Sequence, residues 1–224
     1  MKKTAFLLKL RTHLVQKIPA INNSSYPGDS GYTLIELLVI TIIIGILAAI
    51  AAPGWLGFIN QRRVSAANEV VLRALQEAQN LAKSRKLSYS VAFGTKDDVP
   101  AIAVYQTGTT PSDAEWRSLG KDLALKPGQV VLGSNLADGH NQKAGSSPSL
   151  GNLSPTTDNS ALKKMISFDY FGALYRGSSD PETDLTIAVA ASNGNGYIES
   201  TMRCVKVKSL LGSLKTGKGA ECKN

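Results

Sequence analysis

The chain has 224 residues, of which 43% are hydrophobic and 19% charged, a composition that excludes a fully disordered protein. Two cysteines and two histidines exclude a disulfide scaffold, a four-cysteine zinc site and a histidine-based metal centre. The net charge of +8 comes from two basic ends, residues 1–31 and 203–224, because the stretch between them is nearly neutral. A basic leader is typical of a membrane protein, and a basic C-terminal end is consistent with an anionic partner.

The most informative segment is an apolar block at residues 37–52, which contains no charged residue. Together with residues 32–35 it reaches the roughly 20 residues that a helix needs to cross a bilayer. Glu36 interrupts the segment, and a carboxylate in a membrane is costly, so it is expected to have a partner or a function. A secretory signal peptide is the alternative, but the 31-residue basic leader is too long and the helical pattern continues beyond the block.

The residues around this block carry a resemblance to a known family. Gly31-Tyr32-Thr33-Leu34-Ile35-Glu36, followed by the apolar run to Ala52-Pro53, resembles the class III signal of type IV prepilins and pseudopilins. In that family a prepilin peptidase cuts after the glycine and the new N-terminal amine is methylated. Glu36 then stands at mature position 5 and Pro53 at mature position 22, as in many members, while Tyr32 replaces the commoner phenylalanine.

The resemblance implies three parts: a cleaved leader at 1–31, a transmembrane and filament-core helix at 32–53, and a periplasmic pilin-like domain at 54–224. In it, Gly31 and Tyr32 are the processing residues, and Glu36 and Pro53 the assembly residues. The carboxylate of Glu36 can pair with the free amine of Tyr32 on the same or a neighbouring subunit, which favours one helix register when the helices stack. The basic leader residues keep the N-terminus cytoplasmic, and they are Lys2, Lys3, Lys9, Arg11 and Lys17. A plain membrane anchor is the alternative.

Beyond Pro53 the pattern predicts a helix that continues from Tyr32 to about Lys86, amphipathic in its second half. Its predicted buried face consists of Val64, Ala67, Val71, Ala74, Leu75, Ala78, Leu81 and Ala82. Runs of β-branched and aromatic residues then predict strands at 88–93, 101–106, 129–132, 165–170, 185–191 and 197–209. We interpret them as one antiparallel sheet laid against the helix. Residues 133–160 are rich in turn-forming residues and are predicted to be a long, mobile, surface-exposed loop.

Short similarities over about 140 residues also resemble the GspH/FimT family of minor pseudopilins and minor pilins. They lie at 68–86, at 166–169 with Gly172, at 203–207, and at Gly212 with 215–217. Some members bind DNA through a C-terminal G-R-x-R element, but the corresponding residues are Gly212-Ser213-Leu214-Lys215, so neither arginine is present. The remaining DNA-binding candidates form one predicted basic surface of Lys206, Lys208, Lys215, Lys218 and Lys223.

Cys204 and Cys222 enclose 17 residues. Outside the inner membrane thiols are oxidised, so a disulfide is predicted to tie the C-terminal segment to the last strand, with two free thiols as the alternative. We find no spacing typical of a metal site, a redox pair, a phosphate-binding loop or a catalytic carboxylate pair, and we expect no enzyme activity and no cofactor.

The predicted fold is therefore α+β and pilin-like: a long N-terminal α-helix, half of it transmembrane, packed against an antiparallel β-sheet domain. The predicted protein is a single-pass inner-membrane subunit whose C-terminal domain lies in the periplasm until it enters a pilus or pseudopilus. We expect a minor pilin or pseudopilin that helps to initiate or cap a type IV pilus-like filament with other pilins. The alternatives are an H-type pseudopilin of type II secretion and a minor pilin that binds DNA during natural transformation.

Overall fold

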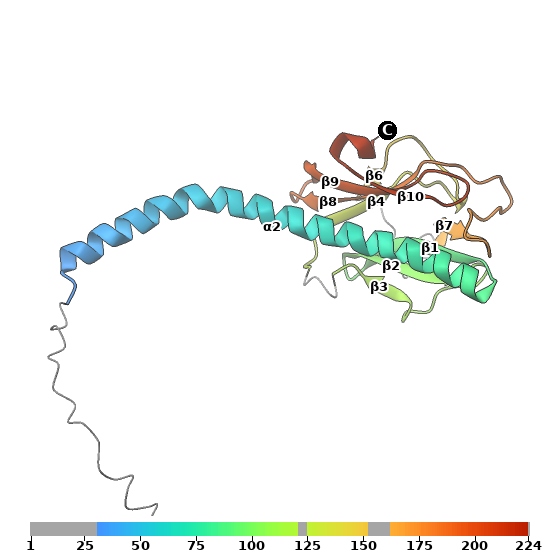
Figure 1. Ribbon diagram of the computed structural model, residues 1–224, viewed down its shortest axis with the longest axis horizontal. Helices are drawn as coiled ribbons and strands as arrows, with labels where there is room; N and C mark the ends of the chain where they lie inside the picture. Colours follow the sequence, from blue (N-terminus) through green and yellow to red (C-terminus); the bar gives the residue numbers. More distant parts are fainter. Residues whose placement is uncertain (1–30, 121–124, 152–161, 224) are drawn as a thin grey trace, which may run out of the picture. The chain divides into compact units, whose positions relative to one another are not determined.

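The computed structural model describes residues 31–120, 125–151 and 162–223. Helix α2 runs from Leu34 to Arg85, close to the predicted bounds (Figure 1). Lys86, directly after it, adopts a positive φ of 57°, a left-handed conformation that ends a helix. The chain divides into two compact units, residues 1–50 and 51–224. The predicted three-part division, and the leader at 1–30 in particular, lies partly outside the described residues and stays a prediction.

The second half of α2 supplies one side of the core of the second unit. Seven of its eight predicted core positions are buried, and Leu81 is half-buried. These side chains recur every three or four residues, so they form one stripe along the helix and pack against the inner faces of two sheets. The amphipathic helix is thus confirmed residue by residue.

Two five-stranded sheets complete the second unit, where one sheet was predicted (Figure 1). The first has the order β3-β2-β1-β7-β5, with bounds Trp116–Ser118, Val99–Gln106, Tyr89–Lys96, Lys164–Phe168 and Gly139–His140. The second has the order β10-β9-β8-β4-β6, with bounds Leu214–Lys218, Tyr197–Val207, Leu185–Ser192, Val130–Ser134 and Ser149–Leu150. All strand pairs among the described residues are antiparallel except β5 with β7, which is parallel.

The prediction of a mobile, exposed loop at 133–160 was wrong for its described part. Strands β5 and β6 lie there, and Asn135 and Asn141 are buried. The Asn141 amide donates to the carbonyl oxygens of Ser167 and Tyr175, both at 2.9 Å, and its Oδ1 accepts from the Ser167 N–H at 2.8 Å. Buried asparagine side chains therefore supply backbone hydrogen bonds that strand pairing supplies elsewhere. The polar composition of residues 133–151 thus did not make this segment exposed. Residues 152–160 lie outside the described residues.

One side chain of α2, that of Gln79, hydrogen-bonds to a loop from each sheet. The Nε2 of Gln79 donates to the carbonyl oxygen of Gly172, after β7, at 3.2 Å and to that of Gly212, before β10, at 2.7 Å. Both glycines have a positive φ, and a Cβ on Gly212 would lie 2.6 Å from the Gly172 oxygen. Only glycine fits such a close approach, so this junction of helix and sheets depends on both positions.

Candidate functional site

The first candidate site is the apolar start of α2. Residues Leu34–Ala51 have a mean hydropathy of 2.9 and none of them is buried. Within the described residues this is the single stretch of helix long and apolar enough to cross a membrane. A run of exposed leucine and isoleucine side chains has no stable place in water, so this segment needs an apolar environment.

The helix begins with a cap that the sequence analysis did not assign. The backbone N–H of Glu36 donates to the side-chain oxygen of Thr33 at 3.2 Å, and the Leu37 N–H donates to the Thr33 carbonyl oxygen at 3.2 Å. Thr33 is therefore the N-cap of α2. The signal was present in the sequence, because threonine followed three residues later by glutamate is a capping pattern. Glu36 also lies in the first turn, where the helix dipole favours a negative charge.

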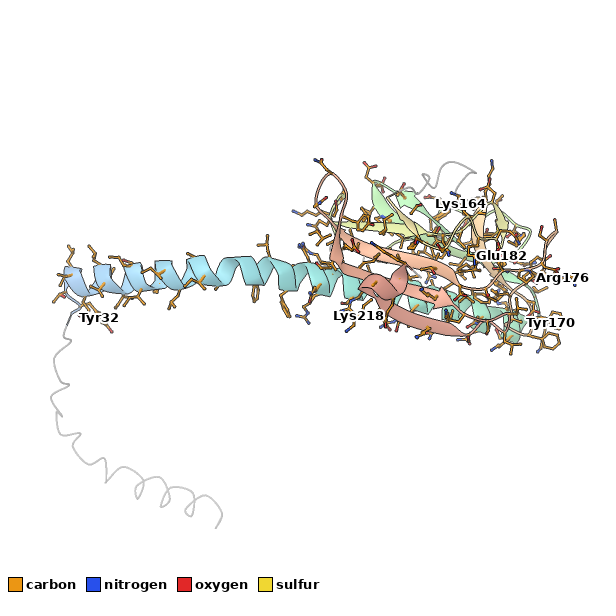
Figure 2. The ribbon with its side chains drawn as sticks, turned by 90° about the horizontal axis from the view of Figure 1, so that it is seen from above. Tyr32, Lys164, Tyr170, Arg176, Glu182 and Lys218 are labelled. Carbon is orange, nitrogen blue, oxygen red and sulfur yellow. A yellow bond between two sulfur atoms is a disulfide. The ribbon has the colours of Figure 1, made fainter. Side chains whose placement is uncertain are left out.

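The predicted processing residues lie just outside this cap. Gly31 and Tyr32 precede the first helical residue, and the Tyr32 side chain is 75% exposed (Figure 2). Among the described residues, nothing lies within 4 Å of the position that a Cβ on Gly31 would take. Pro53 lies inside α2, which continues on both sides of it. The processing and assembly roles of these residues stay predictions.

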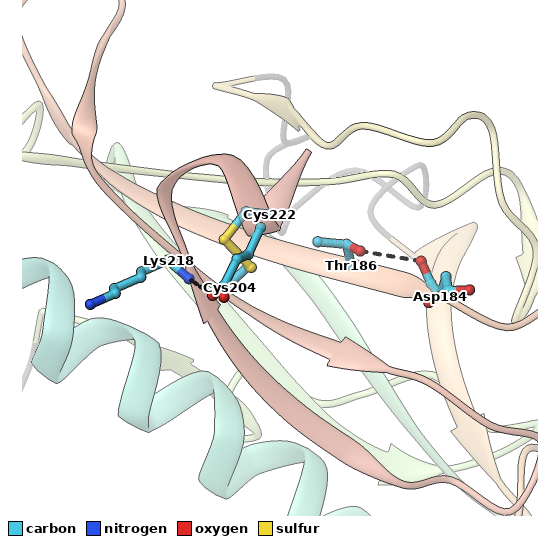
Figure 3. The surroundings of a disulfide bond; sticks show 6 residues. Asp184, Thr186, Cys204, Lys218 and Cys222 are labelled. Atoms are coloured by element: carbon cyan, nitrogen blue, oxygen red, sulfur yellow. Dashed lines mark hydrogen bonds between the residues drawn. A yellow bond between two sulfur atoms is a disulfide. The ribbon is translucent and has the colours of Figure 1, made fainter. Parts of the chain in front are cut away.

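The second candidate site is the C-terminal end, where the predicted disulfide is confirmed. Cys204 on β9 is bonded to Cys222 of the short 3-10 helix η2, Gly219–Cys222, and their Cα atoms are 5.7 Å apart (Figure 3). The bond lies in a small buried cluster with Ala188, Ala190 and Met202 on the face of the second sheet that points away from the core. It therefore clasps the C-terminal segment over that face.

The predicted basic surface of five lysines is not formed. Lys206 is only 5% exposed, and burial lowers the pKa of its ammonium group. Lys206 lies opposite Lys215 in the β9–β10 register, whereas Lys218 lies opposite Arg203. Because side chains alternate along a strand, these two pairs point to opposite faces of the sheet. No single surface can therefore contain Lys206, Lys215 and Lys218.

Two further lysines of that predicted surface are engaged with acids. Lys208 pairs with Asp184, and this hydrogen bond holds the pKa of the Asp184 carboxyl below its usual range. Lys223 pairs with Glu199 at 2.5 Å. Neither pair can be inferred from the sequence, because each joins residues 24 positions apart.

His140, expected in a polar loop, instead lies on β5 at the end of a chain of hydrogen-bonded hydroxyl groups. Its Nδ1 is 2.8 Å from the Ser167 Oγ, which is 2.7 Å from the Ser90 Oγ, which in turn is 2.8 Å from the Thr107 Oγ1. Burial lowers the pKa of His140. Ser90 and Ser167 are fully buried, so the arrangement stabilises the first sheet and offers no nucleophile to a substrate. No cluster of three or more metal-ligating side chains occurs among the described residues.

Comparison with known proteins places the first site in context. The prokaryotic N-terminal methylation motif matches residues 27–52. The type IV major pilin protein PilA of Myxococcus xanthus is 45% identical over 64 residues, 29% of each chain, so the match spans less than a third of that pilin. The type II secretion system core protein G of Pseudomonas aeruginosa is 31% identical over 101 residues, 44% of this chain and 68% of that protein.

Among solved structures, the minor pseudopilin EpsH from the type 2 secretion system of Vibrio cholerae is similar to 70% of this chain and 97% of its own, with a TM-score of 0.36 and 10% identity. The residues that match the methylation motif include the whole apolar segment that the structure leaves exposed. The N-terminal methylation motif and the shared length with core protein G lead to one conclusion: the chain belongs to the family of type IV pilins and type II secretion pseudopilins.

Proposed function

We propose that this protein is a minor pilin or pseudopilin, a structural subunit that helps to initiate or cap a type IV pilus-like filament. The observation that carries the proposal is the exposed apolar helix Leu34–Ala51, which starts directly after Gly31, Tyr32 and the Thr33 cap. Such a helix is stable in a bilayer before assembly and between neighbouring helices afterwards. Prepilin peptidase and other pilins are the proposed partners.

In this proposal the chain is anchored in the inner membrane as a single-pass protein, and the second unit lies in the periplasm. The basic leader supports this orientation, because cationic residues remain on the cytoplasmic side. The disulfide supports it as well, because thiols outside the cytoplasm are oxidised. Within this role the protein needs neither a cofactor nor catalytic activity.

The proposal is tested in the organism that encodes the chain. A deletion is expected to lower the number of filaments while leaving the filaments that form normal in thickness, because an initiating subunit is needed once per filament. The mature chain should be present in purified filaments at a small fraction of the major subunit. A chain that stays in the inner membrane, with filament number unchanged by its deletion, would refute the proposal.

The same deletion strain separates the alternatives. Loss of secreted enzymes with intact surface pili indicates an H-type pseudopilin of type II secretion, whereas loss of pili indicates a minor pilin. For the DNA-binding alternative, gel shifts of the mature chain at low and moderate salt are the test, with Ser213→Arg restoring part of the G-R-x-R element. The five lysines do not favour DNA binding, because they point to both faces of the second sheet and two of them are paired with acids.

A further inference from the structure

A polar pocket of about 380 Å³ lies in the second unit between α2 and the edge of the second sheet. The helix contributes Ser65, Asn68 and Glu69, and the remaining lining residues are Arg203, Thr216, Gly217, Lys218 and Glu221. Gly217 lies opposite Cys204 in the β9–β10 register, and a Cβ on it would be 3.1 Å from the Cys204 Sγ. The disulfide and η2 thus fit tightly against the strand that forms one wall of the pocket.

Asn68 is the first sign that the pocket has a ligand. It follows Val64 by one helical turn and therefore lies on the core stripe, where a nonpolar residue is expected. The side chain is 6% exposed, and its Oδ1 has no hydrogen-bond partner among the described residues. Buried amide groups are nearly always satisfied, so an amide oxygen left unsatisfied at the lining of a pocket indicates a missing hydrogen-bond donor.

The charges of the pocket indicate the sign of the ligand that carries this donor. Arg203 and Lys218 lie directly opposite each other in the β9–β10 register. Neither side chain forms an ion pair within the part of the chain that the structure describes. Like charges at opposed positions of neighbouring strands destabilise a sheet, so an anion between them would stabilise both. Figure 3 shows the Lys218 side chain extending on the side of the strand that faces α2.

The two acids of the pocket differ, because Glu69 has a cationic partner whereas Glu221 keeps its charge. Glu69 pairs with Arg73 at 3.3 Å, and the Glu221 Oε2 accepts a hydrogen bond from the Lys218 N–H at 3.1 Å. Counting Glu69 as neutralised by Arg73, the remaining charges are two cations and one acid, an excess of one positive charge. A group with one negative charge balances this excess. A doubly charged phosphate would exceed it and would be repelled by the carboxylate of Glu221.

We propose that this pocket binds a carboxylate group, with Arg203 and Lys218 as its charge partners and Asn68 Oδ1 accepting a hydrogen bond from the N–H of an amide next to the carboxylate. The carboxylate has two sources, the C-terminus of a polypeptide or an acidic side chain within one. Both place an amide group within a few atoms of the charge, which suits the side chain of Asn68. This inference does not depend on the role of the protein in a filament.

The test is a titration of the mature full-length chain in detergent, followed by the side-chain and backbone NMR signals of the pocket residues. N-acetylglycine, a carboxylate beside an amide, should give saturable shifts, and N-acetylglycinamide, which lacks the charge, should give none. N-acetylglutamic acid α-amide represents an acidic side chain, so the tighter of the two acids identifies the source. Inorganic phosphate should bind more weakly than either. An absence of saturable shifts with both acids, or tighter binding of phosphate, would overturn the proposal.

Variants make the test specific. Arg203→Gln should weaken N-acetylglycine binding at least tenfold, while Lys215→Gln, on the opposite face of the same edge, should change it less than twofold. Asn68→Leu should fold with equal or higher stability and lose the preference for N-acetylglycine over acetate. Equal effects of Arg203→Gln and Lys215→Gln would show general charge attraction and refute the site. A destabilised Asn68→Leu chain that keeps the preference would show an amide satisfied by water alone, which also refutes it.

Discussion

The side-chain oxygen of Thr33 accepts a hydrogen bond from the backbone N–H of Glu36 at 3.2 Å, so the residue held by the cap is also the one expected to pair with a neighbouring amine. The cap fixes the first turn of α2 and with it the position of the Glu36 carboxylate. The start of α2 and the position of the Glu36 charge therefore both depend on the hydrogen bond between Thr33 and Glu36.

Thr33→Ala should therefore loosen the first turn. Loss of an N-cap hydrogen bond typically costs about 1 kcal/mol of helix stability. In detergent-solubilised mature protein, hydrogen exchange at the Glu36 amide is expected to rise several-fold, while Thr33→Ser, which keeps the oxygen, should exchange like the wild type. Unchanged exchange in Thr33→Ala would contradict the capping role.

Cleavage is expected between Gly31 and Tyr32. The measurement is the intact mass of the protein from a host with prepilin peptidase, which should lack residues 1–31 and carry one N-terminal methyl group. A bulky residue at position 31 should block processing, and Gly31→Ala should be processed partly. A full-length N-terminus, or a cut near Ala52, would contradict this prediction.

Glu36→Ala should separate insertion from assembly. Removing the carboxylate takes a charge out of the bilayer, so the amount of membrane-inserted protein should be unchanged or higher. Incorporation into filaments should fall, because the amine of a neighbour loses its partner. Quantitative blots of membrane and filament fractions measure both effects, with Glu36→Asp as the control that keeps the charge. Normal incorporation of Glu36→Ala would rule out the pairing role.

A double variant with Cys204→Ser and Cys222→Ser should have a less stable second unit than the wild type. Closing a loop of this length contributes about 3 kcal/mol in the chain-entropy account. The free energy of unfolding is measured by denaturant titration of the mature protein, and the wild type under reducing conditions is the matched control. Both should lose a similar amount, and a double variant as stable as the oxidised wild type would show that η2 stays in place without the bond.

The pH dependence of stability between pH 7 and 5 should depend on His140, the one histidine in residues 32–224. Burial lowers the pKa of His140 in the folded protein below the ordinary value of about 6.5. As pH falls through that ordinary value, the unfolded chain binds a proton before the folded chain does, so stability is full above about pH 6.5 and decreases below it. Thermal unfolding of His140→Asn should lose most of this decrease, and an identical decrease would contradict the assignment.

The sequence predicted the features that depend on local periodicity. The buried stripe from Val64 to Ala82 follows from spacing alone, and the apolar segment follows from composition. Strand β10 was missed because Leu214–Lys218 has a glycine and two lysines and no run of β-branched residues. It is a strand because β9 supplies its hydrogen-bond partners.

The burial of Lys206 was not predicted, although the disulfide that brings the C-terminal segment over this strand was. Lys206 alternates with Val205 and Val207, which face the core, so the lysine lies on the other face of the sheet, and such a face is usually wet. Here the disulfide folds the C-terminal segment over that face, through a contact between residues that are 18 positions apart. A pattern within one strand carries no information about what later covers it.

The double hydrogen bond of Gln79 has a mechanical consequence. It joins α2 to a loop of each sheet at one point, so a force directed along the helix is shared between both sheets at that junction. Both hydrogen bonds are donated by one nitrogen atom, so a rotation of the Gln79 amide breaks both of them together. Gln79 thus couples the helix to both sheets at one polar point, in addition to the apolar packing of the core.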